Sequence, residues 1–271
     1  MSEGANDEIV SFTSAPVVEV VCGAQFHALP LQTAHFGQFW ERVRDAYRKT
    51  LDAPPLAPVL EVPPGSAAAF GAISSWSNLP ELRRVFFVDE ERGRLLQVQP
   101  TRFHHNWQRR ADHDAYPRFP EVRAEFLSSW RTFGAFLRDV GLPPPHVIQG
   151  ELTYINHIPF GELWDGSGFR KLFPWLNPRN GALSESPELE LALHYENPEC
   201  RGRLHVTIRT GVRAADMSRV VMMELTVRGA PATEGPEADL ETWLGSARKL
   251  IVQSFAELTG PDAHSHWGRV K

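Results

Sequence analysis

Leu95-Leu96-Gln97-Val98-Gln99-Pro100-Thr101-Arg102-Phe103-His104-His105-Asn106-Trp107 begins as an apolar strand and becomes polar, basic and aromatic before the first half of the chain ends. Its two glutamines alternate with apolar residues, so both amides lie on one face of the expected strand. Upstream, Arg84-Val85-Phe86-Phe87-Val88 is also strand-like, and the residues from Asp89 to Gly93 have the length and the glycine of a hairpin loop. We therefore expect two antiparallel strands here.

A long amphipathic helix is predicted after this segment, from about residue 121 to residue 140. Val122, Phe126, Trp130 and Phe133 keep to one helical face, and Gly141 followed by prolines ends the pattern. Before the segment, residues 16–26 are rich in β-branched side chains and predict a strand, and apolar residues at helical spacing predict a helix over about 33–48. The proline-rich stretch that follows contains one short extended piece at 59–62.

The second half of the chain repeats this order of elements. Residues 147–159 predict a strand, 169–176 a short helix, 189–195 and 204–209 a hairpin, 220–227 a third strand and 240–258 a long helix. Pro30 and Pro159, which end the two leading strands, are 159 − 30 = 129 positions apart, and this offset places Leu95–Gln99 on Glu224–Arg228. The pattern therefore indicates duplication of a β-α-β-β-β-α unit.

The predicted fold class is α+β, with antiparallel sheets backed by two long helices in a saddle or a sandwich. We expect a flexible N-terminal tail over residues 1–14, a first α+β half over 15–142 and a second half over 143–271. At 271 residues and 42% hydrophobic content the two halves are large enough to pack as one compact unit with a sizeable core.

Composition limits the classes of function. The net charge of −5 argues against a protein that mainly coats nucleic acid, because phosphate binding depends on Lys and Arg. The acidic N-terminus and the lack of a long apolar run predict neither a signal peptide nor a membrane span, which favours the cytoplasm. Cys22 and Cys200 lack metal-binding spacing and are expected to be reduced thiols, and no cofactor motif is present, so we expect no cofactor and no metal.

Polar and aromatic residues at the strand ends form the candidate binding site, because they offer paired hydrogen-bonding groups, positive charge and stacking surfaces. In the first half they are Gln97, Gln99, Arg102, His104, Asn106, Trp107, Tyr116 and Arg118, and in the second half Tyr154, Asn156 and His157. A solvated face, or glutamines satisfied by neighbouring backbone, would explain the same pattern without a ligand.

Three other chemistries fit parts of the pattern. Glu151 and His157, or His104 and His105, could serve as acid and base in an enzyme of a class without a common motif. The histidines at 104, 105 and 113 with Asp112 and Asp114 have metal-ligand atom types, but adjacent histidines in a strand point to opposite faces. Arginines that alternate with aromatic residues between 102 and 123 would suit single-stranded nucleic acid.

A set of short segments spread over nearly the whole chain carries a resemblance to a known family. The segments are Pro16-Val17-Val18-Glu19-Val20, Phe39-Trp40, Phe86-Phe87, Leu96 to Gln99 with Arg102-Phe103 and Asn106-Trp107, Tyr116-Pro117-Arg118, Thr153 to Ile158 and Trp267-Gly268-Arg269. With these the chain resembles a bacterial protein family of about this length that is known as sporadically distributed. The resemblance implies no activity or catalytic residue, and its patchy distribution favours a defence or mobile-element context. His104, His105 and Gln108 depart from the family pattern.

These observations lead to one hypothesis. A non-enzymatic cytoplasmic binding or assembly protein recognises a protein partner or a small ligand through the polar sheet face around Gln97, Gln99 and Arg102. Nucleic acid is the less favoured partner, no membrane is expected, and a homo-oligomer is compatible with the sequence.

Overall fold

One continuous antiparallel sheet forms the protein. The computed structural model describes residues 10–57, 59–61, 83–111, 114–165, 168–176, 188–213, 215–233, 235 and 238–270. Its elements are β1 (Val17–Phe26), α1 (Thr33–Val43), β2 (Lys49–Ala53), β3 (Arg84–Asp89), β4 (Arg94–Gln99), β5 (Arg102–Gln108), α2 (Phe119–Asp139), β6 (Val147–Pro159), β7 (Glu190–Asn197), β8 (Gly202–Val212), β9 (Arg219–Gly229), α3 (Leu240–Leu258) and α4 (Pro261–His266). The nine strands of the described residues lie in the order β2-β3-β4-β5-β1-β6-β9-β8-β7, so the expected α+β class is confirmed.

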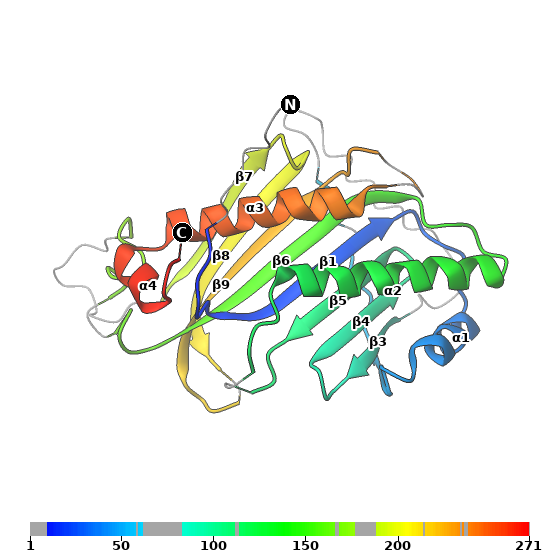
Figure 1. Cartoon of the computed structure of the whole chain (residues 1–271), viewed down its shortest axis with the longest axis horizontal. Helices are drawn as coiled ribbons and strands as arrows, with labels where there is room; N and C mark the ends of the chain where they lie inside the picture. Colours follow the sequence, from blue (N-terminus) through cyan, green and yellow to red (C-terminus); the bar gives the residue numbers. More distant parts are fainter. Residues whose placement is uncertain are drawn as a thin grey trace.

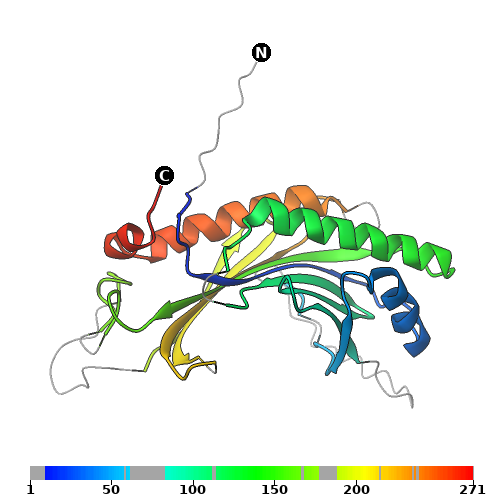
Figure 2. The same ribbon diagram turned by 60° about the horizontal axis from the view of Figure 1, so that its bottom comes forward.

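The long helices α2 and α3 lie side by side on one face of the sheet (Figure 1). The sheet curves away from them at both ends, and no helix of the described residues covers its other face (Figure 2). Strand residues alternate between these two faces. Val20, Cys22 and Phe103 point to the helices and are buried there, and the ring of Phe103 stacks on that of Phe133 of α2 at 5.1 Å.

The strand order is similar on the two sides of the β1–β6 pair, except that β2 at one edge has no counterpart at the other. β1 and β6 pair along the middle, from Val17 to Phe26 on one strand and from Val147 to Asn156 on the other. β5 and β9, the last strands before α2 and α3, flank this pair. The strand that occupies the place of β9 in the first half is therefore β5, and the offset of 129 wrongly matched β4 to β9.

Several element boundaries differ from the predictions. The hairpin of β3 and β4 and the helix α2 are confirmed, but the opening segment is two strands, because the chain turns at Pro100 and Thr101 before β5. α1 ends at Val43, five residues before the predicted end, and β2 was not predicted. The extended piece at 59–61 is not a strand, and residue 62 lies outside the described residues.

The N-terminal segment 10–16 packs on the second half of the chain. Phe12 is 5% exposed and its ring contacts Phe255 of α3 and Trp267 after α4. The backbone N–H groups of Thr13 and Ser14 donate to the carbonyls of Gly268 and Trp267. Residues 10–14, which we predicted as part of a flexible tail, are thus held in place by these contacts, and Trp267 after α4 is buried as well.

Cys22 and Cys200 are both buried and unbridged. Burial raises the pKa of Cys22 and raises that of Cys200 to about 11, so both are protonated thiols at neutral pH. None of the helices in the described ranges is long and apolar enough to cross a membrane.

Candidate functional site

The predicted site residues lie on two opposite faces of the sheet. Those that point away from α2 and α3 are Gln97, Gln99, Arg102, His104, Asn106 and His157, and those on the helix side are Trp107, Tyr116, Arg118, Tyr154 and Asn156. Strand alternation produces this division, because neighbouring residues such as His104 and His105 must point in opposite directions. The sequence therefore predicted two groups of residues as one site.

We call the sheet face that points away from α2 and α3 the polar face. On it, side chains in register form a row across four adjacent strands. Gln99 of β4 lies opposite Arg102 of β5, Arg102 opposite Gln25 of β1, and Gln25 opposite Gln149 of β6. All four side chains are at most 5% exposed. No helix of the described residues covers these long polar side chains, and another part of the chain buries them instead.

The covering segment is the strap, residues 54–57 and 59–61, which follows β2. The Gln99 side chain accepts a hydrogen bond from the N–H of Leu56 and donates one to the Leu56 carbonyl, both at 3.0 Å. Arg102 donates to the carbonyl of Ala57 at 2.9 Å. The polar face thus binds the backbone of an extended segment that runs across its strands.

The far end of the strap is held in the same way. Gln149 donates to the Val59 carbonyl at 2.8 Å and accepts from the N–H of Glu61 at 3.0 Å. The Glu61 carboxylate then reaches His205 of β8, with 2.6 Å between oxygen and Nε2. Burial opposes ionisation of Glu61, but the hydrogen bond and charge of His205 with two nearby arginines lower the pKa of this carboxyl. Arg203 of the same strand, β8, also approaches the Glu61 carboxylate, at 3.9 Å.

A cluster of ionisable side chains on the polar face surrounds Glu151. Glu151 of β6 accepts a hydrogen bond from Arg228 at 2.6 Å, and Arg102 and His104 each approach its carboxylate to 3.9 Å. Burial opposes ionisation of Glu151, yet the positive groups around it lower the pKa of the carboxyl. Burial lowers the pKa of His104 to about 4, so this imidazole is neutral at pH 7.

A chain of hydrogen bonds continues away from the strap. Arg84 donates to Gln97 at 2.8 Å, Gln97 donates to Asn106 at 2.8 Å, and Asn106 donates to Glu19 of β1. Burial raises the pKa of Glu19, against the effect of its hydrogen bonds from Asn106 and Gln108. Gln97 and Asn106 therefore contact other parts of the sheet and brace the polar face from one side.

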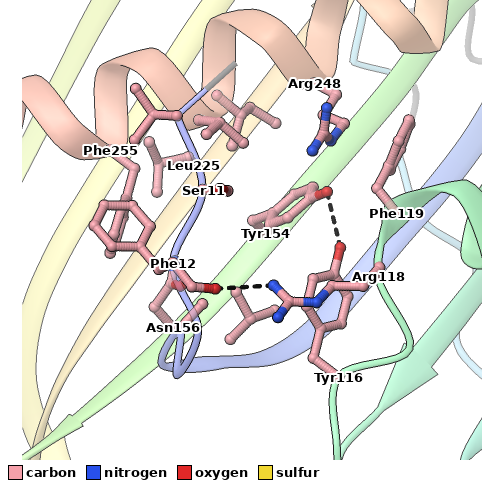
Figure 3. A pocket seen from close by; sticks show the side chains of 15 residues that line it. Ser11, Phe12, Tyr116, Arg118, Phe119, Tyr154, Asn156, Leu225, Arg248 and Phe255 are labelled. Atoms are coloured by element: carbon pink, nitrogen blue, oxygen red, sulfur yellow. Dashed lines mark hydrogen bonds between the residues drawn. The ribbon is translucent and has the colours of Figure 1, made fainter. Parts of the chain in front are cut away.

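Four of the five helix-side residues, all except Trp107, line a cavity between the N-terminal segment, α3 and the loop before α2 (Figure 3). The hydroxyls of Tyr116 and Tyr154 form a hydrogen bond at 3.1 Å, and Arg118 donates to the Phe12 carbonyl at 2.9 Å. The Asn156 side chain donates to the Met223 carbonyl at 3.1 Å and so connects β6 to β9. Trp107 packs against Tyr116 with 5.1 Å between ring centroids.

The geometry does not favour the acid–base pairs or the metal site considered from the sequence. Glu151 and His157 are six residues apart on one strand, roughly 20 Å at about 3.3 Å per residue, too far to act on one substrate atom. His104 and His105 lie on opposite faces, and in the described ranges no three His, Cys, Asp or Glu side chains are grouped to hold a metal. Asp112 and His113 lie outside the described residues.

An arginine and aromatic surface for nucleic acid is not formed by this segment. Phe103, Trp107 and Phe119 are 0%, 3% and 4% exposed and belong to the core under α2, whereas Arg102 lies on the polar face. Bases could not stack on these rings without unfolding the sheet.

Sequence reasoning missed several residues of both groups. Gln25 lies near the end of one predicted strand and Gln149 near the start of another. Their position beside Arg102 depends on the pairing of β1 with β5 and β6. Arg248 of α3 lines the helix-side cavity and had no local motif. The prolines of the strap did signal an extended segment, although nothing in them showed which surface it crosses.

No protein-family model matches the sequence, and the search of curated proteins found no significant similarity. The resemblance drawn from short segments of the sequence therefore stays a prediction, and the functional argument depends on the geometry described above.

Proposed function

We propose that this protein binds an extended polypeptide segment of a partner protein across its polar face, in the way that it holds its own strap. The observation that carries this proposal is the pair of bidentate contacts from Gln99 and Gln149 to the strap backbone. Main-chain recognition of this kind provides affinity with little dependence on sequence, as when a peptide adds to a sheet edge. A segment of another protein could make the same hydrogen bonds.

The way in which the strap is held supports displacement by a partner. Val59 and Leu60 are 42% and 53% exposed, so the apolar side chains of the strap contribute little burial to its attachment. A segment fixed mainly by backbone hydrogen bonds, each worth about 0.5–1.5 kcal/mol, opens at a small fraction of the cost of global unfolding.

Buried polar atoms without hydrogen-bond partners beneath the strap also support binding of a partner segment in place of the strap. The amide oxygen of Gln25 and the Nε of Arg102 are buried without a hydrogen-bond partner in the described structure. Buried polar atoms of this kind are rare in folded proteins, and each costs about 1–3 kcal/mol. A partner segment that supplied one N–H and one carbonyl here would bind more tightly than the strap does.

We further propose that the sheet is a saddle produced by duplication of one α+β unit, with the halves 15–142 and 143–271 packed as one body. The matching strand order around β1 and β6 and the equivalent places of α2 and α3 support this. A saddle exposes one broad curved face, which suits an extended ligand that crosses several strands.

A strapless variant tests the binding proposal. Ala53 and Arg84 are direct partners in the β2–β3 pair, so residues 54–83 can be replaced by Asn-Gly, a two-residue hairpin turn. The probe is a fluorescent peptide with the sequence of residues 54–61, and fluorescence polarisation measures its Kd. We expect micromolar binding to the strapless variant and at least about tenfold weaker binding to the full chain, in which the strap competes.

Two leucine substitutions in the strapless variant locate the bound peptide. Gln99→Leu removes a bidentate contact and should weaken binding by about tenfold or more. Gln108→Leu is the matched control, because Gln108 lies on the same face but contacts Glu19 instead of the strap. The proposal is wrong if a folded strapless variant binds neither this peptide nor an unrelated extended one, or if both substitutions weaken binding equally.

A further inference from the structure

The helix-side cavity is separate from the polar face, because the sheet lies between them. It has a volume of about 80 Å³ and is lined mainly by apolar side chains, among them Phe12, Leu225, Ile251 and Phe255. These four side chains are at most 6% exposed. The N-terminal segment forms one wall of the cavity (Figure 3).

Both charged groups that line this cavity are cations. Arg248 stacks on the ring of Phe119 at 5.4 Å, and in the described parts of the chain no carboxylate lies within ion-pair distance of it. Arg118 is bound to the carbonyls of Phe12 and Thr13. In Figure 3 the guanidinium of Arg248 reaches from α3 toward the hydroxyl end of Tyr154. An unpaired guanidinium beside an apolar cavity favours an anionic group.

The tyrosine pair supplies a further donor. The hydroxyls of Tyr116 and Tyr154 share one hydrogen bond at 3.1 Å, which uses one of their two hydrogens and leaves the other to donate to a ligand. Burial raises the pKa of Tyr116 to about 12 and raises that of Tyr154 well above its ordinary value, so both hydroxyls keep their protons at neutral pH.

We infer that this cavity binds a small monocarboxylic acid with an apolar body, whose carboxylate lies between Arg248 and the hydroxyls of Tyr116 and Tyr154. The apolar body would lie against Phe12 and Ile251. A dry cavity of about 150 Å³ holds benzene, so the present volume suits a short chain, or a single ring after a small shift of the N-terminal segment. This site does not depend on the peptide-binding proposal.

Phenylacetate and its neutral analogue 2-phenylethanol are the probes, and calorimetric titration of the full chain is the measurement. We expect phenylacetate to bind with a millimolar or lower Kd and at least about tenfold more tightly than 2-phenylethanol, because only the carboxylate carries the negative charge and the two oxygens that pair with a guanidinium. Methyl resonances of Leu225 and Ile251 should shift during the phenylacetate titration, which places the ligand in the cavity.

Variants identify the groups that hold the carboxylate. Arg248→Met keeps an apolar chain but removes the charge, so phenylacetate binding should fall by about tenfold or more while 2-phenylethanol binding is unchanged. Tyr154→Phe, which removes one hydroxyl, should weaken phenylacetate binding by several fold. Arg131→Met, at an exposed position of α2, is the control and should have no effect.

Three results would overturn the inference. The first is no binding of phenylacetate up to about 10 mM, well above the millimolar range that a ligand of few atoms reaches. The second is equal affinity for the acid and the alcohol. The third is unchanged phenylacetate affinity in both Arg248→Met and Tyr154→Phe, and a misfolded Arg248→Met variant would leave Tyr154→Phe to decide.

Discussion

Gly23 illustrates how a single residue determines the geometry of the polar face. It lies in β1 between His104 on one neighbouring strand and Glu151 on the other. A Cβ atom at Gly23 would overlap the His104 ring and lie 2.9 Å from its Nε2. The absence of a side chain therefore allows the imidazole to cover β1 and approach the carboxylate at 3.9 Å. The sequence showed a glycine within a strand, but the reason for it required the register.

Gly23→Ala should destabilise the protein by about 1–3 kcal/mol, because the His104 ring must leave its place in a packed environment. Urea denaturation followed by circular dichroism gives the free energy of unfolding. Gly134→Ala is the control, since a Cβ at this α2 position meets no atom within 4 Å, and it should stabilise the helix by up to about 1 kcal/mol. Equal effects of the two substitutions would contradict the role of Gly23.

His104 and His105 make stability depend on pH. Burial lowers the pKa of His104 to about 4 and that of His105 to about 3, whereas an unfolded histidine has a pKa near 6.5. Between pH 6.5 and pH 4 the unfolded chain therefore binds more protons than the folded protein. Stability from both groups is fully present above pH 6.5 and is lost as the pH falls.

The loss of stability between pH 7 and pH 5 should be about 2 kcal/mol smaller in His105→Leu than in the unmodified protein, because one such histidine is removed. Urea denaturation at both pH values measures the difference. His146→Leu, at an exposed position, is the matched control. If His105→Leu loses as much stability as the unmodified protein, His105 is not the proton-linked group.

At the scale of elements, the sequence predicted those whose apolar residues face the core in a regular pattern. α2 and the β3–β4 hairpin were predicted within two residues of their bounds because their buried faces recur with the helix and strand periods. β2 was missed because it is an edge strand, exposed along four of its five residues, and so lacks that pattern. A periodic pattern of apolar residues arises where one face of an element is buried, so an exposed edge strand shows little of this pattern.

The segment 169–176 shows the opposite case. Phe169, Leu172 and Phe173 have helical spacing and are buried, but only one turn forms, closed by a hydrogen bond of 2.7 Å from the N–H of Phe173 to the Phe169 carbonyl. Pro174 explains the stop, because it lacks an N–H and disfavours helical backbone at the residue before it. A single turn buries the same side chains that a full helix would have buried.

The candidate site was predicted in part for the same physical reason. Gln97, Gln99 and Arg102 share the polar face because strand alternation is readable from the sequence. Tyr154 and Asn156 were assigned to the same site although they point to the helices, since nothing local fixes which face of β6 matches which face of β4. Only the pairing of β1 with both β5 and β6 relates those faces.

At the scale of the whole molecule, the two halves of the chain contact each other along the centre of the sheet. β1 and β6 pair along the middle of the sheet, and Phe12 of the N-terminal segment packs on Phe255 and Trp267 of the second half. A half without its partner would expose a long central strand edge and apolar surface, which favours aggregation over a stable monomer.

Fragments 1–142 and 143–271 should therefore be poorly folded alone and should form a 1:1 complex when refolded together. Size-exclusion chromatography with light scattering and circular dichroism would detect the complex and its native-like secondary structure. Phe12→Ala in the first fragment should weaken the complex by at least about a hundredfold, because truncation of a buried Phe costs about 3–5 kcal/mol. Leu51→Ala, at a residue that is 46% exposed on the edge strand, should not. A first fragment that is monomeric and melts at the temperature of the whole protein would mean that the β1–β6 pair is a contact between independent domains, and the polar face would then not be one continuous binding surface.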